Sequence, residues 1–224
     1  AVISPIRGQG LICFQDNGAV CKAVDVVFPV LHGKNGEDGS MQGLLQMAGI
    51  AYVGPHVAES AVAMDKTLTK LVMDNAGIPQ AAWLLVRGSE LPSRMAEYLD
   101  TVESRFSYPV FVKPAGTGSS VGVSKATDRA SLEKALIFAA KYDEKILVEE
   151  FIHGREIEVA VMGNANPVAS VCGEIDSGAE FYDYDAKYVT DTSVAYIPAR
   201  IPENVAEELR ETAVKVYSAI GCQG

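Results

Sequence analysis

The chain has 224 residues, 48% of them hydrophobic, and a formal net charge of −10 at pH 7. This acidic balance excludes nucleic acid and anionic membrane surfaces as partners, because both attract basic proteins. The sequence has no apolar run long enough for a membrane span and no signal-peptide pattern, so a cytoplasmic α/β protein is predicted. It has no CxxC pair, so its cysteines are expected to be reduced thiols. With this acidic balance, any anion is expected to bind through a few lysines gathered at one site.

The first candidate site follows an apolar run near the N-terminus. Residues 1–22 predict loop and a minor strand, whereas residues 24–31 (VDVVFPVL) predict a strand buried on both faces of a parallel sheet. The loop HGKNGEDG follows and places His32 and Glu37 at the carboxyl end of that strand, where open α/β sheets collect ligands. A plain connecting loop is the alternative interpretation.

Helical patterns occupy the next stretch of the chain. Residues 37–47 predict a helix with acidic residues in its first turn, and residues 50–53 predict a strand, which together give a small βαβ lobe. A single helix is expected over residues 60–75, carrying Met64-Asp65-Lys66, and a further helix opens near Pro92.

Residues 110–124, VFVKPAGTGSSVGVS, predict a strand, a flexible loop and a returning strand. The glycines and serines of the loop can bring backbone N–H groups close to a phosphate. No Gly-Lys-Ser/Thr closes the loop, so phosphate binding here requires a hairpin lid with Lys113 reaching in from the strand. A flexible surface hairpin remains the alternative.

The next pattern predicts a nucleotide-base slot. Asp128 or Ser131 is expected to cap a helix that runs to residue 142. Strands are predicted over residues 146–148 and 156–162, and the connector between them carries carboxylates beside apolar residues, which suits the edge and faces of an adenine ring. Two strands with solvated glutamates are the alternative.

The last third of the chain adds a tyrosine-rich loop and a helix. Residues 168–175 predict a strand, and FYDYDAKYV at 181–189 offers a cation for phosphate and phenols for a substrate, or else an aromatic surface loop. Pro202 opens a helix that Gly221 ends.

Five motifs in this order resemble those of the D-alanine:D-alanine ligase family of the ATP-grasp superfamily. They are HGKNGEDGSMQG at 32–43, MDK at 64–66, VKPAGTGSSVG at 112–122, VEEFIHGREIEVAV at 148–161 and FYDYDAKY at 181–188. The resemblance runs from about residue 24 to residue 224. It implies an ATP-grasp fold with a partial N-terminal parallel-sheet lobe (1–58), a central lobe with the lid hairpin (59–147) and a truncated C-terminal lobe (148–224).

The resemblance also implies a reaction. In that family ATP phosphorylates the carboxylate of one D-alanine, and the amine of a second attacks the acylphosphate to give D-alanyl-D-alanine for peptidoglycan synthesis. ATP, D-alanine and Mg²⁺ are the expected partners, and a homodimer is expected. Three alternatives stay open: D-serine as the second substrate, another ATP-grasp carboxylate–amine ligase, and a nucleotide-binding fragment without catalysis.

Roles follow from the resemblance at the matching positions. Lys66 and Lys113 would contact the ATP phosphates under a lid that carries Ser120, and Lys187 would face the transferred phosphoryl group. The adenine connector would be formed by Glu149, Glu150, Phe151 and Ile152.

Further roles concern the ribose and the substrate. Glu156 would bind the ribose, and Phe181 would also contact the nucleotide. His32 and Glu37 would lie near the first D-alanine, which Ser119 and Tyr188 would orient through hydrogen bonds.

Other parts of the family pattern have no counterpart in this sequence. These are the first strand with its glycine-rich loop and glutamate, and a C-terminal part with an arginine, a serine, and the carboxylates and asparagine that bind two Mg²⁺. No metal ligand is therefore predicted in this chain, and a 224-residue fragment ending here is predicted to be inactive by itself.

Overall fold

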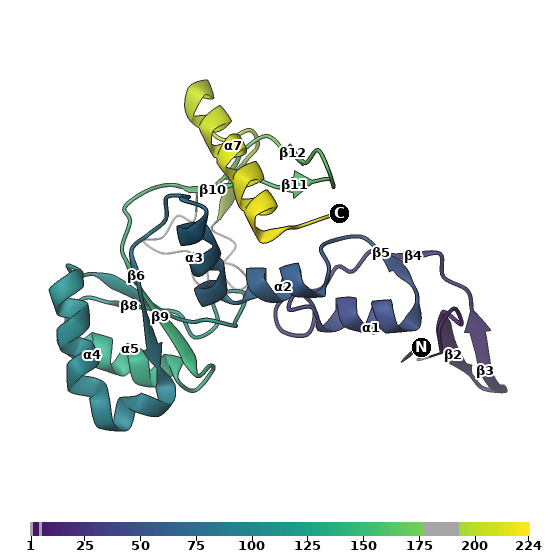
Figure 1. The fold of residues 1–224 in the computed structure, drawn as a ribbon, viewed down its shortest axis with the longest axis horizontal. Coiled ribbons are helices and arrows are strands. Elements are labelled where there is room, and N and C mark those ends of the chain that lie inside the picture. The colour runs from purple at the N-terminus through teal and green to yellow at the C-terminus, as the bar shows by residue number, and fades with distance from the viewer. Residues whose placement is uncertain (1, 5, 177–192) are drawn as a thin grey trace.

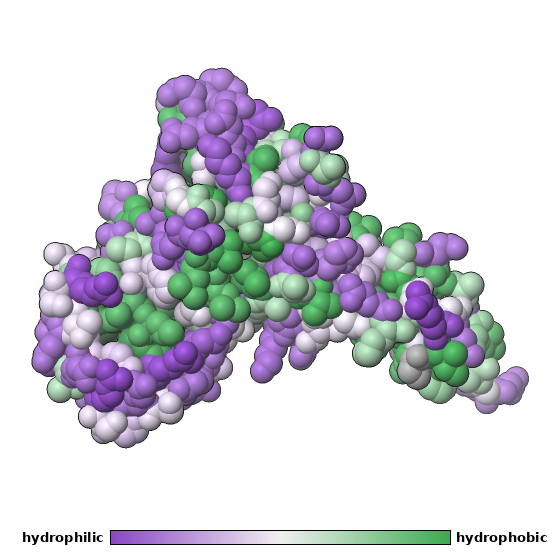
Figure 2. All heavy atoms as spheres, viewed as in Figure 1, coloured by the Kyte–Doolittle hydropathy of each residue, from purple (hydrophilic) through white to green (hydrophobic). Residues whose placement is uncertain are grey.

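The computed structural model describes residues 2–4, 6–176 and 193–224. The described chain is elongated in outline, with a small N-terminal lobe at one end and a four-stranded sheet with its helices at the other (Figure 1). The last helix, α7, stands above the junction between them. Hydrophilic side chains gather over the far end of α7 and the outer edge of the central lobe, and hydrophobic surface lies between (Figure 2).

The N-terminal lobe contains the predicted βαβ unit. β4 (Val26–Val27) pairs in parallel with β5 (Ala51–Tyr52), and α1 (Ser40–Ala48) connects them. Residues before it form an antiparallel sheet of β1 (Val2–Ile3), β2 (Leu11–Gln15) and β3 (Gly18–Lys22). The expectation of loop plus a minor strand was therefore wrong for this segment.

Two details of the lobe differ from the prediction. Residues 24–31 are not a strand buried on both faces, because Val26, Phe28 and Val30 are 57%, 73% and 72% exposed. Within the described residues β4 pairs with β5 alone, so the apolar side chains of this segment have too few neighbours to be buried. Acidic residues are also absent from the first turn of α1, because Gly39, at φ +91°, is the N-cap and the helix begins one residue later.

The single helix predicted over residues 60–75 is two helices, α2 (Val57–Met64) and α3 (Lys66–Asn75). Asp65 separates them, since its backbone is extended and its carboxylate accepts hydrogen bonds from the N–H groups of Thr67 and Leu68. A side chain that satisfies these N–H groups starts a new helix. The break places Lys66 in the first turn of α3.

The central lobe is a four-stranded antiparallel sheet in the order β6-β9-β7-β8. Its strands are β6 (Trp83–Arg87), β9 (Lys145–Glu150), β7 (Val110–Pro114) and β8 (Ser124–Ala126). After the short η1 (Gly88–Glu90), α4 (Leu91–Arg105) and later α5 (Arg129–Ala139) pack on one sheet face. Their shared core includes Val86, Leu99, Val102, Val112, Leu136 and Val148.

This sheet confirms the predicted hairpin, although its returning strand starts only at Ser124, so Val121 and Val123 belong to the loop. β9 runs without a break across residue 147, the expected boundary between the second and third lobes. The division into lobes stays a prediction.

The C-terminal segment forms two small sheets beside a long helix. β10 (Glu156–Glu158), β13 (Gly173–Asp176) and β14 (Val194–Tyr196) pair antiparallel, as do β11 (Val161–Met162) and β12 (Val168–Ala169). The strands predicted over 156–162 and 168–175 are thus each divided in two. α7 (Glu203–Ile220) follows Pro202 and ends at Gly221 in a left-handed conformation, as predicted. No helix in the described ranges is long and apolar enough to cross a membrane.

Both predicted caps of α5 are used at once. The Asp128 carboxylate accepts from the Ser131 N–H at 2.7 Å, and the Ser131 hydroxyl accepts from the Asp128 N–H at 3.0 Å, which is a capping box. Asp128→Ala should lower the free energy of unfolding by about 1 kcal/mol. Glu133→Ala on the exposed side of the same helix should change it by less than about 0.5 kcal/mol. Urea denaturation followed by circular dichroism measures both, and equal losses would contradict the cap.

Candidate nucleotide and substrate site

A cavity of about 540 Å³ lies where the N-terminal lobe meets the lid hairpin. The loop after β4 contributes His32 and Asp38, and the junction of α2 and α3 contributes Asp65. The lid contributes Ser119 among other residues, and the turn after α5 contributes Asp143. Segments that are distant in sequence thus bring several charged and polar side chains to one cavity.

Two carboxylates of the loop after β4 accept hydrogen bonds from backbone N–H groups of the same loop and of the start of α1. The Glu37 carboxylate accepts from the Gly33 N–H at 2.5 Å, and Asp38 accepts from the N–H groups of Asn35 and Ser40 at 2.8 and 3.0 Å. The Asn35 N–H is the main reason that the pKa of Asp38 lies below its ordinary value. His32, at the start of this loop, lines the cavity, whereas Glu37 is not among the residues that line it.

The lid lies close against this loop. A Cβ placed on Gly118 would lie 3.2 Å from the Gly33 Cα, so the two backbones nearly touch. Ser119 and Ser120 adopt left-handed φ values of +50° and +58°, and Ser119 lines the cavity. The Gly116 N–H donates to the Asp143 carboxylate at 2.6 Å, which ties the lid to the turn after α5.

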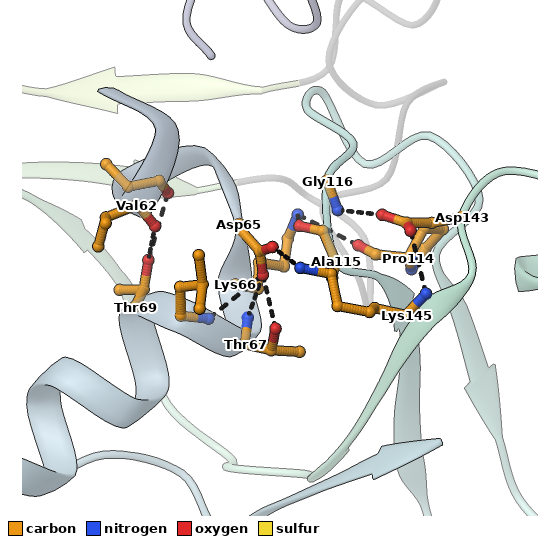
Figure 3. A network of polar contacts seen from close by, with 12 residues as sticks. Val62, Asp65, Lys66, Thr67, Thr69, Pro114, Ala115, Gly116, Asp143 and Lys145 are labelled. Atoms are coloured by element: carbon orange, nitrogen blue, oxygen red, sulfur yellow. Dashed lines mark hydrogen bonds and ion pairs between the residues drawn. The ribbon is translucent and has the colours of Figure 1, made fainter. Parts of the chain in front are cut away.

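Lys66 holds the base of the lid (Figure 3). Its ammonium donates to the carbonyl oxygens of Pro114, Ala115 and Thr117 at 3.4, 3.3 and 2.5 Å, and its backbone N–H donates to Ala115 at 3.1 Å. Burial lowers the pKa of Lys66, and the charge of Lys113 lowers it further. Lys66 therefore brings a desolvated positive charge to the strand end from which the lid starts.

Glu149 lies between two lysines under the lid. Its Oε1 is 2.7 Å from the Lys70 ammonium, and its Oε2 forms an ion pair with Lys113. The Glu149 side chain is only 9% exposed. Burial acts to raise the pKa of Glu149, but the charges and hydrogen bonds of Lys113 and Lys70 outweigh it, so the pKa lies below its ordinary value.

This pKa makes part of the stability depend on pH. A carboxyl whose pKa is lower in the folded state stabilises the fold above its unfolded pKa, about 4.3 for glutamate, and loses that contribution as the pH falls through the folded pKa. Glu149→Gln should therefore cost about 2 kcal/mol at pH 7, and the cost should shrink below pH 4.3. Urea denaturation at pH 7 and pH 3 measures it. Glu208→Gln, on the exposed side of α7, is the control, and a cost for Glu149→Gln that does not change with pH would contradict the ion pairs.

The connector after β9 provides an apolar surface. The Phe151 ring packs against Phe111 with ring centres 5.8 Å apart. The Lys125 ammonium lies 4.8 Å from the centre of the Phe151 ring. Ile152 is 62% exposed. The predicted connector began at Glu149, but β9 runs to Glu150, so Glu149 and Glu150 lie in the strand and not in the connector. The Glu150 carboxylate accepts from the Ala82 N–H at 2.7 Å, which ties the end of β9 to the residue before β6.

The structure brings some of the predicted residues together and not others. His32 and Ser119 line the cavity, and Lys66, Lys113 and Glu149 gather at the base of the lid. Glu156 lies on β10, in a different sheet, where it pairs with Ile175. Predicted residues that lie outside the described ranges are Phe181, Lys187 and Tyr188.

The sequence interpretation missed three charged residues at this site. Lys70 contacts Glu149, Asp143 anchors the lid, and Lys145 pairs with Asp65. A local signal existed only for Lys70, because it follows Lys66 by four residues and so shares its helix face. The partners of the others come from distant parts of the chain.

Comparison with protein families assigns most of the chain. The model described as "D-ala D-ala ligase N-terminus" matches residues 8–55, and the model described as "D-ala D-ala ligase C-terminus" matches residues 72–224. The chain belongs to the D-alanine–D-alanine ligase family. The resemblance drawn from the five motifs is confirmed, and the match begins ahead of residue 24, within the N-terminal antiparallel sheet.

Members of the family resemble the chain closely. D-alanine–D-alanine ligases of Acetivibrio thermocellus and Ruminiclostridium cellulolyticum are 56% and 52% identical to it over 91% and 92% of its length. Those alignments cover 54% and 56% of the two relatives, so the chain spans about half the length of the curated relatives it matches.

Solved structures of the family share the fold. The VanG D-Ala:D-Ser ligase from Enterococcus faecalis superposes with a TM-score of 0.82 at 35% identity, over 99% of this chain and 63% of that one. The D-alanine–D-alanine ligase from Coxiella burnetii gives a TM-score of 0.73 at 31% identity, over 95% and 58%. These neighbours confirm the expected α/β ATP-grasp fold.

Proposed function

We propose that the chain is part of an ATP-dependent ligase that joins two D-alanines into D-alanyl-D-alanine through an acylphosphate, for peptidoglycan synthesis. The observation that carries this proposal is the junction of lid and cavity. A glycine-rich lid rises from a base that holds Lys66 and Lys113, and it borders the cavity that His32 and Ser119 line.

ATP binds, in this proposal, along the lid base and the connector. Lysine ammonium groups and backbone N–H groups complement the charge on phosphoryl oxygens, and such positioning supplies most of the catalysis in phosphoryl transfer. Lys66, Lys113 and Ser120 serve the phosphates, and Lys187 faces the transferred group. Adenine takes the slot beside Glu149, Glu150, Phe151 and Ile152, while Glu156 and Phe181 serve the rest of the nucleoside.

The first D-alanine occupies the cavity, with Ser119 and Tyr188 orienting it and Glu37 shaping the loop that presents His32. A carboxylate oxygen attacks the terminal phosphorus of ATP and ADP leaves. The amine of the second D-alanine then attacks the acyl carbon and phosphate leaves, which closes the peptide bond.

Mg²⁺ accompanies ATP in this proposal and would neutralise charge that develops on the phosphates. Among residues 2–4, 6–176 and 193–224 no group of three or more His, Cys, Asp or Glu side chains is arranged to hold a metal ion. The proposal also includes a homodimeric, cytoplasmic enzyme, in line with the family resemblance.

A second candidate differs in the second substrate. The likeness to a D-Ala:D-Ser ligase over 99% of the chain favours D-serine as that candidate. A nucleotide-binding module without catalysis is the candidate from another class.

Phosphate release by the full-length gene product with ATP and Mg²⁺ tests the proposal. Release should require D-alanine and should produce D-alanyl-D-alanine in the mass spectrum. Adding D-serine distinguishes the second candidate, which would give the mixed dipeptide. Release that does not depend on D-alanine would refute the ligase, and calorimetric titration of the 224-residue chain with ADP then tests the module.

A further inference from the structure

Two lysines serve one buried carboxylate at the base of the lid. Lys70 projects from α3 and Lys113 from β7, and they contact different oxygens of Glu149 on β9. The side chains of Lys70 and Glu149 are only 13% and 9% exposed. Lys70 also donates to the Ala81 carbonyl oxygen at 3.1 Å, which fixes its ammonium from a second side.

The two lysines are not equivalent in position. Lys113 lies on the strand that leads into the lid, and its side chain is 26% exposed, twice the exposure of Lys70. A phosphate under the lid would draw Lys113 away from Glu149. A buried carboxylate that loses its cation pays a large desolvation cost, so a second cation must remain beside it.

We infer that Lys70 is a positioning residue for the nucleotide base: it holds Glu149 ionised through Oε1, so that Oε2 can accept a hydrogen bond from the exocyclic amino group of adenine. This inference rests on the proposed function and deepens it. Lys113 leaves Oε2 for the phosphates in the same event, so nucleotide binding exchanges one partner of Glu149 for another.

Base selectivity follows from this arrangement. Adenine presents an amino donor to the carboxylate, whereas hypoxanthine presents a carbonyl oxygen at the same position, which an ionised carboxylate repels. Without Lys70, the buried Glu149 either takes up a proton or keeps Lys113 on Oε2. In the second case Oε2 cannot accept a hydrogen bond from adenine. A protonated carboxyl both donates and accepts, so it no longer distinguishes the two bases.

Calorimetric titration of the full-length ligase with ADP and with IDP tests the inference. The wild-type chain should bind ADP at least about tenfold more tightly than IDP. In Lys70→Met the ratio should fall close to one, and in Lys70→Arg it should recover. Lys134→Met, on the exposed side of α5, is the matched control and should keep the wild-type ratio.

The outcomes separate this inference from the function it rests on. If wild type binds ADP and Lys70→Met keeps the preference for ADP, Lys70 does not position the base, although the nucleotide site stands. If wild type binds no ADP, the proposed nucleotide site falls and the inference falls with it. Circular dichroism checks folding, and if Lys70→Met does not fold, Lys70→Gln replaces it; a wild-type ratio in that variant would also overturn the inference.

Discussion

Lys113→Ala should lower turnover with ATP and D-alanine by about 1,000-fold in the full-length ligase. The lysine stands on β7 at the point where the strand leads into the lid, and its ammonium is the more exposed of the two that contact Glu149. In the proposed reaction, its removal deletes a positive charge beside the phosphates of ATP. The measurement is the steady-state rate of D-alanine-dependent phosphate release.

Two controls make the Lys113 result specific. Lys134→Ala removes an exposed lysine of α5 and should leave turnover unchanged. Thermal unfolding of Lys113→Ala should show a folded chain, because Lys70 still neutralises Glu149. An unchanged rate in a folded Lys113→Ala enzyme would mean that the hairpin is not the phosphate lid.

Patterns that act within a few residues predicted the fold best. The strand–loop–strand of residues 110–124, the cap at Asp128 and the helix between Pro202 and Gly221 each depend on local chemistry, and each is present. Asp65 shows the limit of such patterns. Apolar residues continue across it, but its carboxylate satisfies the N–H groups of a new helix, and the cap prevailed over the periodicity.

Contacts between segments that are distant along the chain could not be predicted from the sequence. The apolar run at residues 24–31 indicated burial, yet burial requires neighbours, and β4 has β5 as its only strand partner among the described residues. Likewise, the four-residue spacing of Lys66 and Lys70 can indicate a shared helix face, but it cannot indicate that Lys70 contacts Glu149, which comes from β9. The lid motif was visible, whereas its closeness to Gly33 depends on how two lobes meet.

Gly122→Ala should destabilise the chain by about 3 kcal/mol, because it combines two costs at the end of the lid. Gly122 has φ +77°, and an added Cβ would lie 2.7 Å from the Pro114 Cγ and 2.8 Å from the Tyr142 Cδ2. In the proposed function the lid holds the phosphates, so a displaced lid should also weaken ADP binding. Urea denaturation and calorimetry measure the two effects.

Gly77→Ala is the control that separates the cost of a left-handed backbone from the cost of the steric clash at Gly122. Gly77 also has a positive φ, +64°, but nothing lies within 4 Å of its added Cβ, so this variant should lose only about 1 kcal/mol, the cost of a left-handed backbone. The difference between the two variants then measures the contact of the lid with Pro114 and Tyr142. Equal losses in the two variants would show that the lid does not pack there, and a lid that does not pack there could not close over bound phosphates in the way proposed.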